Sequence, residues 1–282
     1  MSLGREFVVF DTETTGMPPS GRLVEIGALK VRGNHVVDRF ERLVFPECPI
    51  PSQVTAIHGI RDADVAEAPN AGTVLNEFVE WAGAAPLVGH TVAFDAAIVA
   101  AECQRFGIPV PVNPTWCTLR AARSLLRRPS HSLQALVQDL GLPQSKHHRA
   151  MADAEHTLNL LWRMMESAGD RFKLSAFGKG RALSDLAPET VTLPDSHEIL
   201  REACDTGEAI GLKYRLASGW LTDCRVSPRF FYRSGGNLWM EALCHEDCFF
   251  KSYRIDRILA ARLCQDAAPV ELRRRFGAWR GF

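Results

Sequence analysis

Two carboxylates stand two positions apart near the N-terminus, directly after an apolar run. In "FVVFDTETTG" (residues 7–16), Asp11 and Glu13 follow four apolar residues. Successive side chains of a strand point to opposite faces, so two residues at this spacing share a face. The pair can therefore converge on one metal ion. The same stretch is also typical of an ordinary strand that ends in a polar turn, so the rest of the chain must distinguish the two.

Two further carboxylates occur in suitable settings. Asp95 stands in "GHTVAFD", where a short strand ends and a helix begins, and Asp153 stands in "HHRAMADAEHT", early in a long helix. Four clustered carboxylates repel one another unless cations lie between them, and hard oxygen ligands favour Mg²⁺ or Mn²⁺. We expect Asp11, Glu13, Asp95 and Asp153 to bind two such divalent cations. Two ions about 3.5–4 Å apart promote in-line attack on phosphodiesters.

A phosphodiester hydrolase of this kind also needs a base. His148 lies five residues before Asp153, and an ordinary imidazole, with a pKa near 6.5, accepts a proton from water at neutral pH. Two other histidines are near enough to compete for this role, namely the adjacent His147 and His156, one helical turn beyond Asp153.

The hydrophobic pattern predicts the elements that position these residues. We expect strands at 6–13, 22–31, 36–45 and 86–90, and helices at 73–83, 93–107, 131–141 and 149–167. Three strands followed by helices that alternate with short strands predict an α/β fold with a mixed sheet covered by helices.

The second half of the chain has a different pattern. Residues 169–196 are rich in Gly, Pro and Ser and have no clear periodicity, so they are interpreted as a linker between a domain at 1–168 and one at 197–282. The latter contains β-rich runs, and "SGGN" between two of them predicts a hairpin.

Composition excludes several classes of protein. A chain of 282 residues that is 46% apolar is long enough for two domains with real cores. Lys plus Arg and Asp plus Glu both number 33, so no net field attracts nucleic acid or a membrane surface. No apolar run approaches the roughly 20 residues that span a bilayer, and no secretory signal is visible. The eight scattered cysteines are expected to be reduced, which indicates a cytoplasmic protein.

Three motifs, taken together and in order, resemble a known family. "DTE" (11–13), "HTVAFD" (90–95) and "HRAMAD" (148–153) are similar to the motifs of the DEDDh exonucleases, over roughly residues 5–168. The resemblance implies a ribonuclease H-like fold with a mixed five-stranded sheet, and cleavage in the 3′→5′ direction. It also implies that the four carboxylates are metal ligands and that His148 is the general base.

The same resemblance extends to substrate contacts and shows some departures. It implies that Thr14, and His58 in "IHGI", lie beside the 3′-terminal nucleotide. Cys117 stands where many members have Asp, and Thr91 stands where Asn is usual. His90, by contrast, is interpreted as a strand-end histidine with its hydrogen bonds satisfied.

The C-terminal half resembles the WYL domain, a small β-rich barrel of SH3/Sm-like type. The match rests on "IGLKYRLASG", "RVSPRFFYRSGGNLWMEALC" and "SYRIDRI", although Leu-Trp-Met at 238–240 replaces the namesake triplet. The resemblance implies a sensor of nucleic acid or of a nucleotide-like ligand, with Arg254 and Arg257 as contacts. A guanidinium suits phosphate, but either arginine could equally form a surface ion pair.

Two features of this half have competing interpretations. "CHEDC" (244–248) offers zinc ligands, but the spacing is loose and buried thiols are the preferred interpretation. The tail "RRRFGAWRGF" (273–282) combines charge with aromatics that can stack on bases, or it is simply solvated.

The sequence therefore predicts a two-domain, metal-dependent 3′→5′ exonuclease that acts on single-stranded DNA or RNA ends and releases nucleoside 5′-monophosphates. The second hypothesis is a regulator that binds nucleic acid without cleaving it. A third, a proofreading partner of a polymerase, ranks lower because no polymerase domain or partner-binding peptide is evident.

Overall fold

The computed structural model describes residues 6–143, 148–169 and 172–264. The chain forms two compact units, and the main division between them falls between Ala187 and Pro188. The tail at 273–282 and His147 lie outside the described residues. Every helix within the described ranges is too short or too polar to cross a bilayer.

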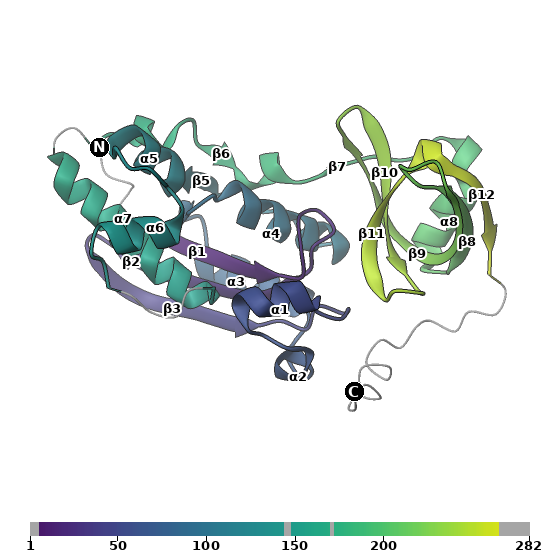
Figure 1. Ribbon diagram of the computed structural model, residues 1–282, viewed down its shortest axis with the longest axis horizontal. Helices are drawn as coiled ribbons and strands as arrows, with labels where there is room; N and C mark the ends of the chain where they lie inside the picture. Colours follow the sequence, from purple (N-terminus) through teal and green to yellow (C-terminus); the bar gives the residue numbers. More distant parts are fainter. Residues whose placement is uncertain (1–5, 144–147, 170–171, 265–282) are drawn as a thin grey trace. The chain divides into compact units, whose positions relative to one another are not determined.

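A mixed sheet of six strands forms the first unit, in the order β3-β2-β1-β4-β5-β6 (Figure 1). β1 pairs antiparallel with β2 and parallel with β4, so the sheet is mixed as the sequence predicts. The strands are β1 (Glu6–Thr14), β2 (Leu23–Arg32), β3 (His35–Leu43), β4 (Leu87–Gly89), β5 (Pro114–Cys117) and β6 (Arg181–Ala182).

Helices cover both faces of this sheet. They are α1 (Ser52–His58), α2 (Asp62–Val65), α3 (Ala71–Ala82), α4 (Ala93–Arg105), α5 (Thr118–Leu125), α6 (Leu133–Asp139) and α7 (Ala150–Ala168). One core joins Val8 and Phe10 of β1 to α3 and α4, and the other joins Phe7 and Val9 to α5, α6 and α7. β1 is apolar on both faces because it lies between these two layers.

The prediction of five strands was one short. The sixth strand, β6, pairs antiparallel with β5 and belongs to the stretch interpreted as a linker. Around it, the short helices η2 (Leu174–Phe177) and η3 (Leu183–Leu186) bury Phe177 and Leu183 in the two cores. These elements are only two to four residues long, too short for a hydrophobic period to show in the sequence.

The second unit is an antiparallel sheet in the order β11-β10-β9-β8-β12, with β7 paired to β9. Its elements are β7 (Glu189–Thr190), η4 (Asp195–His197), α8 (Glu198–Thr206), β8 (Ile210–Arg215), β9 (Leu221–Ser234), β10 (Asn237–Cys244), β11 (Phe249–Arg254), η5 (Ile255–Arg257) and β12 (Ile258–Leu263). The predicted hairpin is confirmed, because Gly235 and Gly236 both have positive φ, of 56° and 76°, as a two-residue turn requires.

The expectation of a barrel is not met. Within the described ranges, β11 and β12 form the two ends of the strand order and no ladder joins them. The sheet curves because the long β9 pairs with β8 through its first half and with β10 through its second half. Helix α8 packs Leu200 and Ala203 against the resulting core. Helix α8 therefore covers apolar side chains of the open sheet, which would be buried inside a closed barrel.

Candidate active site

Three carboxylates come together at the end of β1. The pleat that turns Phe7 and Val9 toward α7 also turns Asp11 and Glu13 toward it. Ligand oxygens of Asp11, Glu13 and Asp153 lie within 4.8 Å of one another, and they form the group of potential metal ligands found within the described residues. A cluster of oxygen donors at this spacing suits a hard divalent cation.

Asp153 belongs to the first turn of α7 and is largely buried. Its Oδ2 accepts a hydrogen bond of 3.0 Å from the backbone N–H of His148, and its Oδ1 lies 3.1 Å from Nδ1 of His156. His148 is exposed and has a left-handed backbone, with φ of 59°. The structure thus brings the predicted base next to one predicted ligand, while His156 contacts the same carboxylate from inside the helix.

Asp95 reaches the site from the opposite face of the sheet. It lies in the first turn of α4, and its Oδ1 accepts hydrogen bonds from the N–H (3.1 Å) and the hydroxyl (2.8 Å) of Thr12. Thr12 stands between Asp11 and Glu13 and points to the α4 side. Asp95 is outside the three-carboxylate group but near enough for its charge to raise the pKa of Asp11.

Glu13, Asp95 and Asp11 hold protons more tightly than carboxyls usually do. Burial, followed by the charges of Asp153 and other carboxylates, raises the pKa of Glu13 to about 8. Burial likewise raises the pKa of Asp95 to about 7, against the hydrogen bonds from Thr12. The pKa of Asp11 rises well above its ordinary value through burial and its acidic neighbours. Such crowding is relieved by a cation, so the residues present fit a divalent metal.

The sequence prediction omitted a buried ion pair beside this cluster. Glu25 lies opposite Glu13 in the β1–β2 ladder and is fully buried. Its carboxylate accepts hydrogen bonds from Nε and Nη2 of Arg149 and from the N–H of Ala150 (2.9 Å). A glutamate within the otherwise apolar run "RLVEIGALKV" was a detectable signal, but its partner lies more than 120 residues away in sequence.

Thr14 and His58 lie close to each other near the same end of β1. Burial lowers the pKa of His58, while Glu25 and the backbone of Thr14 act in the opposite direction. Nδ1 of His58 accepts a 2.9 Å hydrogen bond from the N–H of Ile60, so the neutral ring carries its proton on Nε2. The buried Nε2 makes no hydrogen bond of normal geometry with any described residue, and the backbone of Thr14, which acts on the ring, is at best a weak partner.

Two neighbouring residues of the second motif, His90 and Thr91, have different structural roles. His90 contacts Thr118 Oγ1 at 3.0 Å and the carbonyl of His131 at 2.9 Å, which agrees with a satisfied strand-end histidine. Thr91 has a φ of 73° directly before α4. Asn adopts this left-handed region far more readily than a β-branched residue, so the backbone explains why Asn suits the position.

In the second unit, Arg254 forms a surface ion pair. Its Nε and Nη2 lie 2.9 and 2.6 Å from the carboxylate oxygens of Asp256. The thiol of Cys244 is buried and contacts the carboxylates of Glu246 (3.2 Å) and Asp247 (3.3 Å). All eight cysteines are free. Of the two cysteines of "CHEDC", Cys244 is buried as expected, whereas Cys248 is only partly buried.

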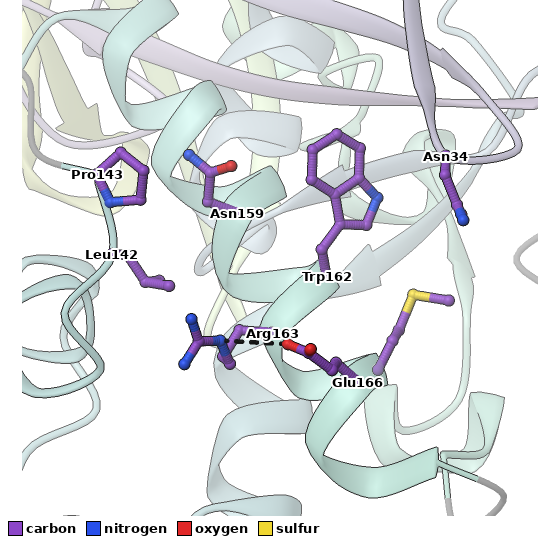
Figure 2. Close-up of a pocket in the computed structure, with 8 residues that line it drawn as sticks. Asn34, Leu142, Pro143, Asn159, Trp162, Arg163 and Glu166 are labelled. Carbon is purple, nitrogen blue, oxygen red and sulfur yellow. Dashed lines mark ion pairs between the residues drawn. The ribbon is translucent and has the colours of Figure 1, made fainter.

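A cavity of about 530 Å³ lies away from the carboxylates (Figure 2). Figure 2 shows Asn159 and Trp162 on α7 with Asn34 beside them, and an ion pair joins Arg163 and Glu166. None of the predicted site residues lines this cavity.

The fold and the site define a class of protein. Residues 8–161 match the family model described as exonuclease, and residues 195–263 match the WYL domain. The chain therefore belongs to the exonuclease family, of DEDDh type, and carries a C-terminal WYL domain.

Curated relatives share the first unit. A DNA polymerase III PolC-type of Halalkalibacterium halodurans is 37% identical over 171 residues, which cover 60% of this chain and 12% of that protein. The PolC-type polymerase of Bacillus subtilis is 32% identical over 168 residues, 58% of this chain and again 12% of the relative. The chain thus spans only a small part of these polymerases.

Solved structures share the fold. A 3′-exonuclease in a structure of 3′-end recognition of a histone mRNA stem-loop has a TM-score of 0.53 at 16% identity, covering 60% of this chain and 66% of that one. An Escherichia coli ExoI–ssDNA complex has a TM-score of 0.53 at 17% identity, covering 84% and 54%.

Proposed function

We propose that this protein is a metal-dependent 3′→5′ exonuclease that hydrolyses single-stranded DNA or RNA ends and releases nucleoside 5′-monophosphates. The observation that carries the proposal is the convergence of Asp11, Glu13 and Asp153 beside the exposed His148. The direction of cleavage comes from the family to which the chain belongs. The free state of all eight cysteines supports the expected cytoplasmic location.

Asp11, Glu13, Asp95 and Asp153 would hold two Mg²⁺ or Mn²⁺ ions. Bound divalent cations neutralise charge on the phosphate and assist attack and departure of the two reacting oxygens. The raised pKa of Glu13 and Asp95 supports this assignment, because a site that favours protons over free carboxylates is also one that gains from a cation. Asp95 is assigned as a metal ligand for two reasons: its negative charge raises the pKa of Asp11, and it occupies the ligand position of the second motif.

His148 acts as general base in this proposal. It is exposed, so its ring is accessible to a water molecule at the phosphate. Its backbone N–H is bonded to Asp153, which fixes the main chain of the base relative to a metal ligand. The ring accepts the proton of the attacking water, and the 3′-oxygen leaves on the opposite side of the phosphorus.

His58 and Thr14 bind the terminal nucleotide. Nε2–H of His58 is a buried donor without an acceptor of normal geometry among the described residues, and an unpaired buried donor is costly. A sugar hydroxyl or phosphate oxygen of the terminal nucleotide would satisfy it. This supports His58 as a donor to substrate, with the backbone of Thr14 beside it.

The WYL domain binds nucleic acid in this proposal, but the observation that supports it is not the predicted one. Arg254 is engaged by Asp256, which weakens its assignment, and the charge of Arg257 also acts on Asp256. The turn between β8 and β9 instead exposes Trp220 to 76%. An exposed indole suits stacking on bases, and β8, which leads into this turn, carries the exposed Lys213 and Arg215 that would attract phosphate.

Labelled oligonucleotides test the proposed activity. Single-stranded DNA and RNA carrying a 5′ label are incubated with the wild type, with Asp11→Ala and with His148→Ala, in Mg²⁺, in Mn²⁺ and in EDTA. We expect shortening one nucleotide at a time, which requires metal, is lost in Asp11→Ala and is reduced to a slow residual rate in His148→Ala, while the circular dichroism of both variants is unchanged. Persistent full-length oligonucleotide that remains bound to the wild type under every metal would identify a binding protein instead. Comparing the two sugars gives the substrate preference.

A further inference from the structure

The backbone of His148 is in a conformation that needs support. A non-glycine residue with φ of 59° is strained, at a cost on the order of 1–3 kcal/mol, and persists only where its surroundings fix it. The three residues that follow it, 149–151, contact Glu25 and Gly27 of β2.

Glu25 of β2 holds the first two of these residues. Arg149 donates from Nε at 3.0 Å and from Nη2 at 2.5 Å to the two carboxylate oxygens, and Ala150 donates its backbone N–H at 2.9 Å. Glu25 is fully buried, while the side chain of Arg149 is 36% exposed. These donors occupy the carboxylate, which is consistent with its absence from the three-carboxylate metal group.

Gly27 of β2 leaves room for the backbone of Met151, the third of these residues. A Cβ atom built on Gly27 would lie 2.2 Å from the backbone nitrogen of Met151 and 2.4 Å from the carbonyl carbon of Ala150. Gly27 is in regular strand conformation, so a glycine is needed for space and not for an unusual φ. Glu25 and Gly27 are two residues apart and share the face toward α7.

We propose that Glu25 and Gly27 are positioning residues that fix the first turn of α7 on β2 and thereby hold His148 in its left-handed conformation. Glu25 bonds the residues that follow His148, and Gly27 lets the helix backbone lie directly on the strand. Glu25 is also the cross-strand partner of Glu13. The paired strands β1 and β2 therefore position both the metal-binding carboxylates and the general base His148. The inference rests on the proposed role of His148.

The test uses the full chain with Glu25→Gln, which keeps the size but removes the charge, and with Arg149→Lys, which keeps the charge but loses the two-pronged contact. We expect kcat on a 5′-labelled oligonucleotide to fall about 10- to 100-fold, as for loss of a residue that orients an active-site group. KM should not change in either variant. The Mn²⁺ titration midpoint should stay the same in Arg149→Lys, which keeps the charge, and should rise in Glu25→Gln, because the charge of Glu25 also acts on Asp11 and Glu13; kcat is therefore compared at saturating Mn²⁺. A matched control is Glu155→Gln. Glu155 lies on the same helix and forms an exposed ion pair with Arg39 of β3, so its replacement should leave kcat unchanged.

A double-mutant cycle separates positioning from general stability. If Glu25 acts through His148, then Glu25→Gln should cause no further loss in a His148→Ala background. Losses that multiply in the double variant, or a kcat in both single variants equal to that of the wild type, would overturn the proposal.

Hydrogen exchange gives a readout that does not require activity. The amides of residues 149–151 should exchange faster in Glu25→Gln than in the wild type, while those at the C-terminal end of α7 should not. Unchanged exchange at 149–151 would overturn the proposal even if the enzyme is active. Absence of cleavage by the wild type with altered exchange in the variant would instead reject the exonuclease assignment alone and leave the support of α7 by β2 intact.

Discussion

Thr12 and Asp95 join the two layers of the exonuclease unit at its acidic centre. Asp95 Oδ1 accepts both the N–H and the hydroxyl of Thr12, at 3.1 and 2.8 Å. Thr12 faces α4 while its neighbours on β1 face α7. The bond therefore couples a carboxylate on one face of the sheet to the strand that carries the other carboxylates.

Removing the hydroxyl of Thr12 should weaken this coupling. Thr12→Val keeps the shape of the side chain but deletes a bond to a charged group, for a loss of about 1.5–3 kcal/mol of unfolding free energy. It also removes a contact that lowers the pKa of Asp95, so metal should bind less tightly. Urea denaturation and Mn²⁺ titration measure the two effects. Thr12→Ser, which retains the hydroxyl, serves as control, and equal losses in both variants would contradict the role of the bond.

Metal should stabilise the protein more as pH rises. The pKa of Glu13 is raised to about 8 and that of Asp95 to about 7, against ordinary values of 4.5 and 3.8. A carboxyl with a higher pKa in the folded state contributes stability below its unfolded pKa and loses it as pH rises through the folded value. In EDTA, Tm should therefore fall between about pH 4 and pH 8 through these groups.

Thermal denaturation in EDTA and in Mn²⁺ across this range checks the sign. The increase in Tm caused by Mn²⁺ should grow with pH, because protons and cations compete for the same oxygens. Glu13→Gln should show a smaller metal effect and, in EDTA at pH 8, a higher Tm than the wild type, because a crowded charge has been removed. An effect of Mn²⁺ that is equal at all pH values would argue against binding at these carboxylates.

Much of the exonuclease unit could be predicted from local pattern. The spacing of Asp11 and Glu13 within a strand, and the position of Asp153 in the first turn of a long helix, correctly predicted that their side chains meet. These features depend on the period of one element at a time. The approach of His148 to Asp153 follows from their proximity in sequence.

What the sequence did not reveal depends on contacts between distant segments. The Glu25–Arg149 pair spans two elements with no local sign of their meeting, beyond a charge in an apolar strand. β6 is only two residues long and exists because β5 offers a free edge. That the second sheet stays open likewise depends on the path of β9 and the packing of α8, which no single run of residues determines.

Replacing Thr91 with Asn should stabilise the protein. Thr91 has a φ of 73°, a conformation that is unfavourable for a β-branched side chain, and the residue is exposed. Relief of this strain should add about 1 kcal/mol of unfolding free energy. Urea denaturation of Thr91→Asn gives the value, and Thr91→Val, which keeps the branch, should show no gain. A gain in the Val variant would indicate a cause other than the backbone.

Glu102 should be among the most sensitive residues of α4. It is fully buried between Arg22 (2.8 Å) and Arg105 (3.2 Å) and also accepts the N–H of Leu23. Burial raises its pKa, but the two guanidinium groups outweigh this and hold the pKa below its ordinary value. Breaking such a network leaves buried charge unpaired, so Glu102→Gln should cost about 3–5 kcal/mol.

The exposed pair of Glu6 and Arg32 is the matched control for this prediction. These side chains lie 2.7 Å apart but at the surface, and an exposed pair contributes at most about 1 kcal/mol. In urea denaturation, Glu102→Gln should therefore lose much more unfolding free energy than Glu6→Gln. Equal urea midpoints for the two variants would show that burial does not determine how much the Glu102 ion pairs contribute to the free energy of unfolding.

Trp220 tests the proposed nucleic-acid surface of the WYL domain. The indole is 76% exposed in the β8–β9 turn, so its removal leaves no cavity. If it stacks on a base, Trp220→Ala should cost about 1–3 kcal/mol of binding, which is roughly a 5- to 150-fold increase in Kd. Fluorescence anisotropy with labelled single-stranded DNA in EDTA measures binding without cleavage. Trp220→Phe should retain most of the affinity, and Val112→Ala, an equally exposed apolar residue of the exonuclease unit, should retain all of it. Equal Kd values for the wild type and Trp220→Ala would exclude this turn as a stacking site, because no other group of the turn could replace an aromatic face.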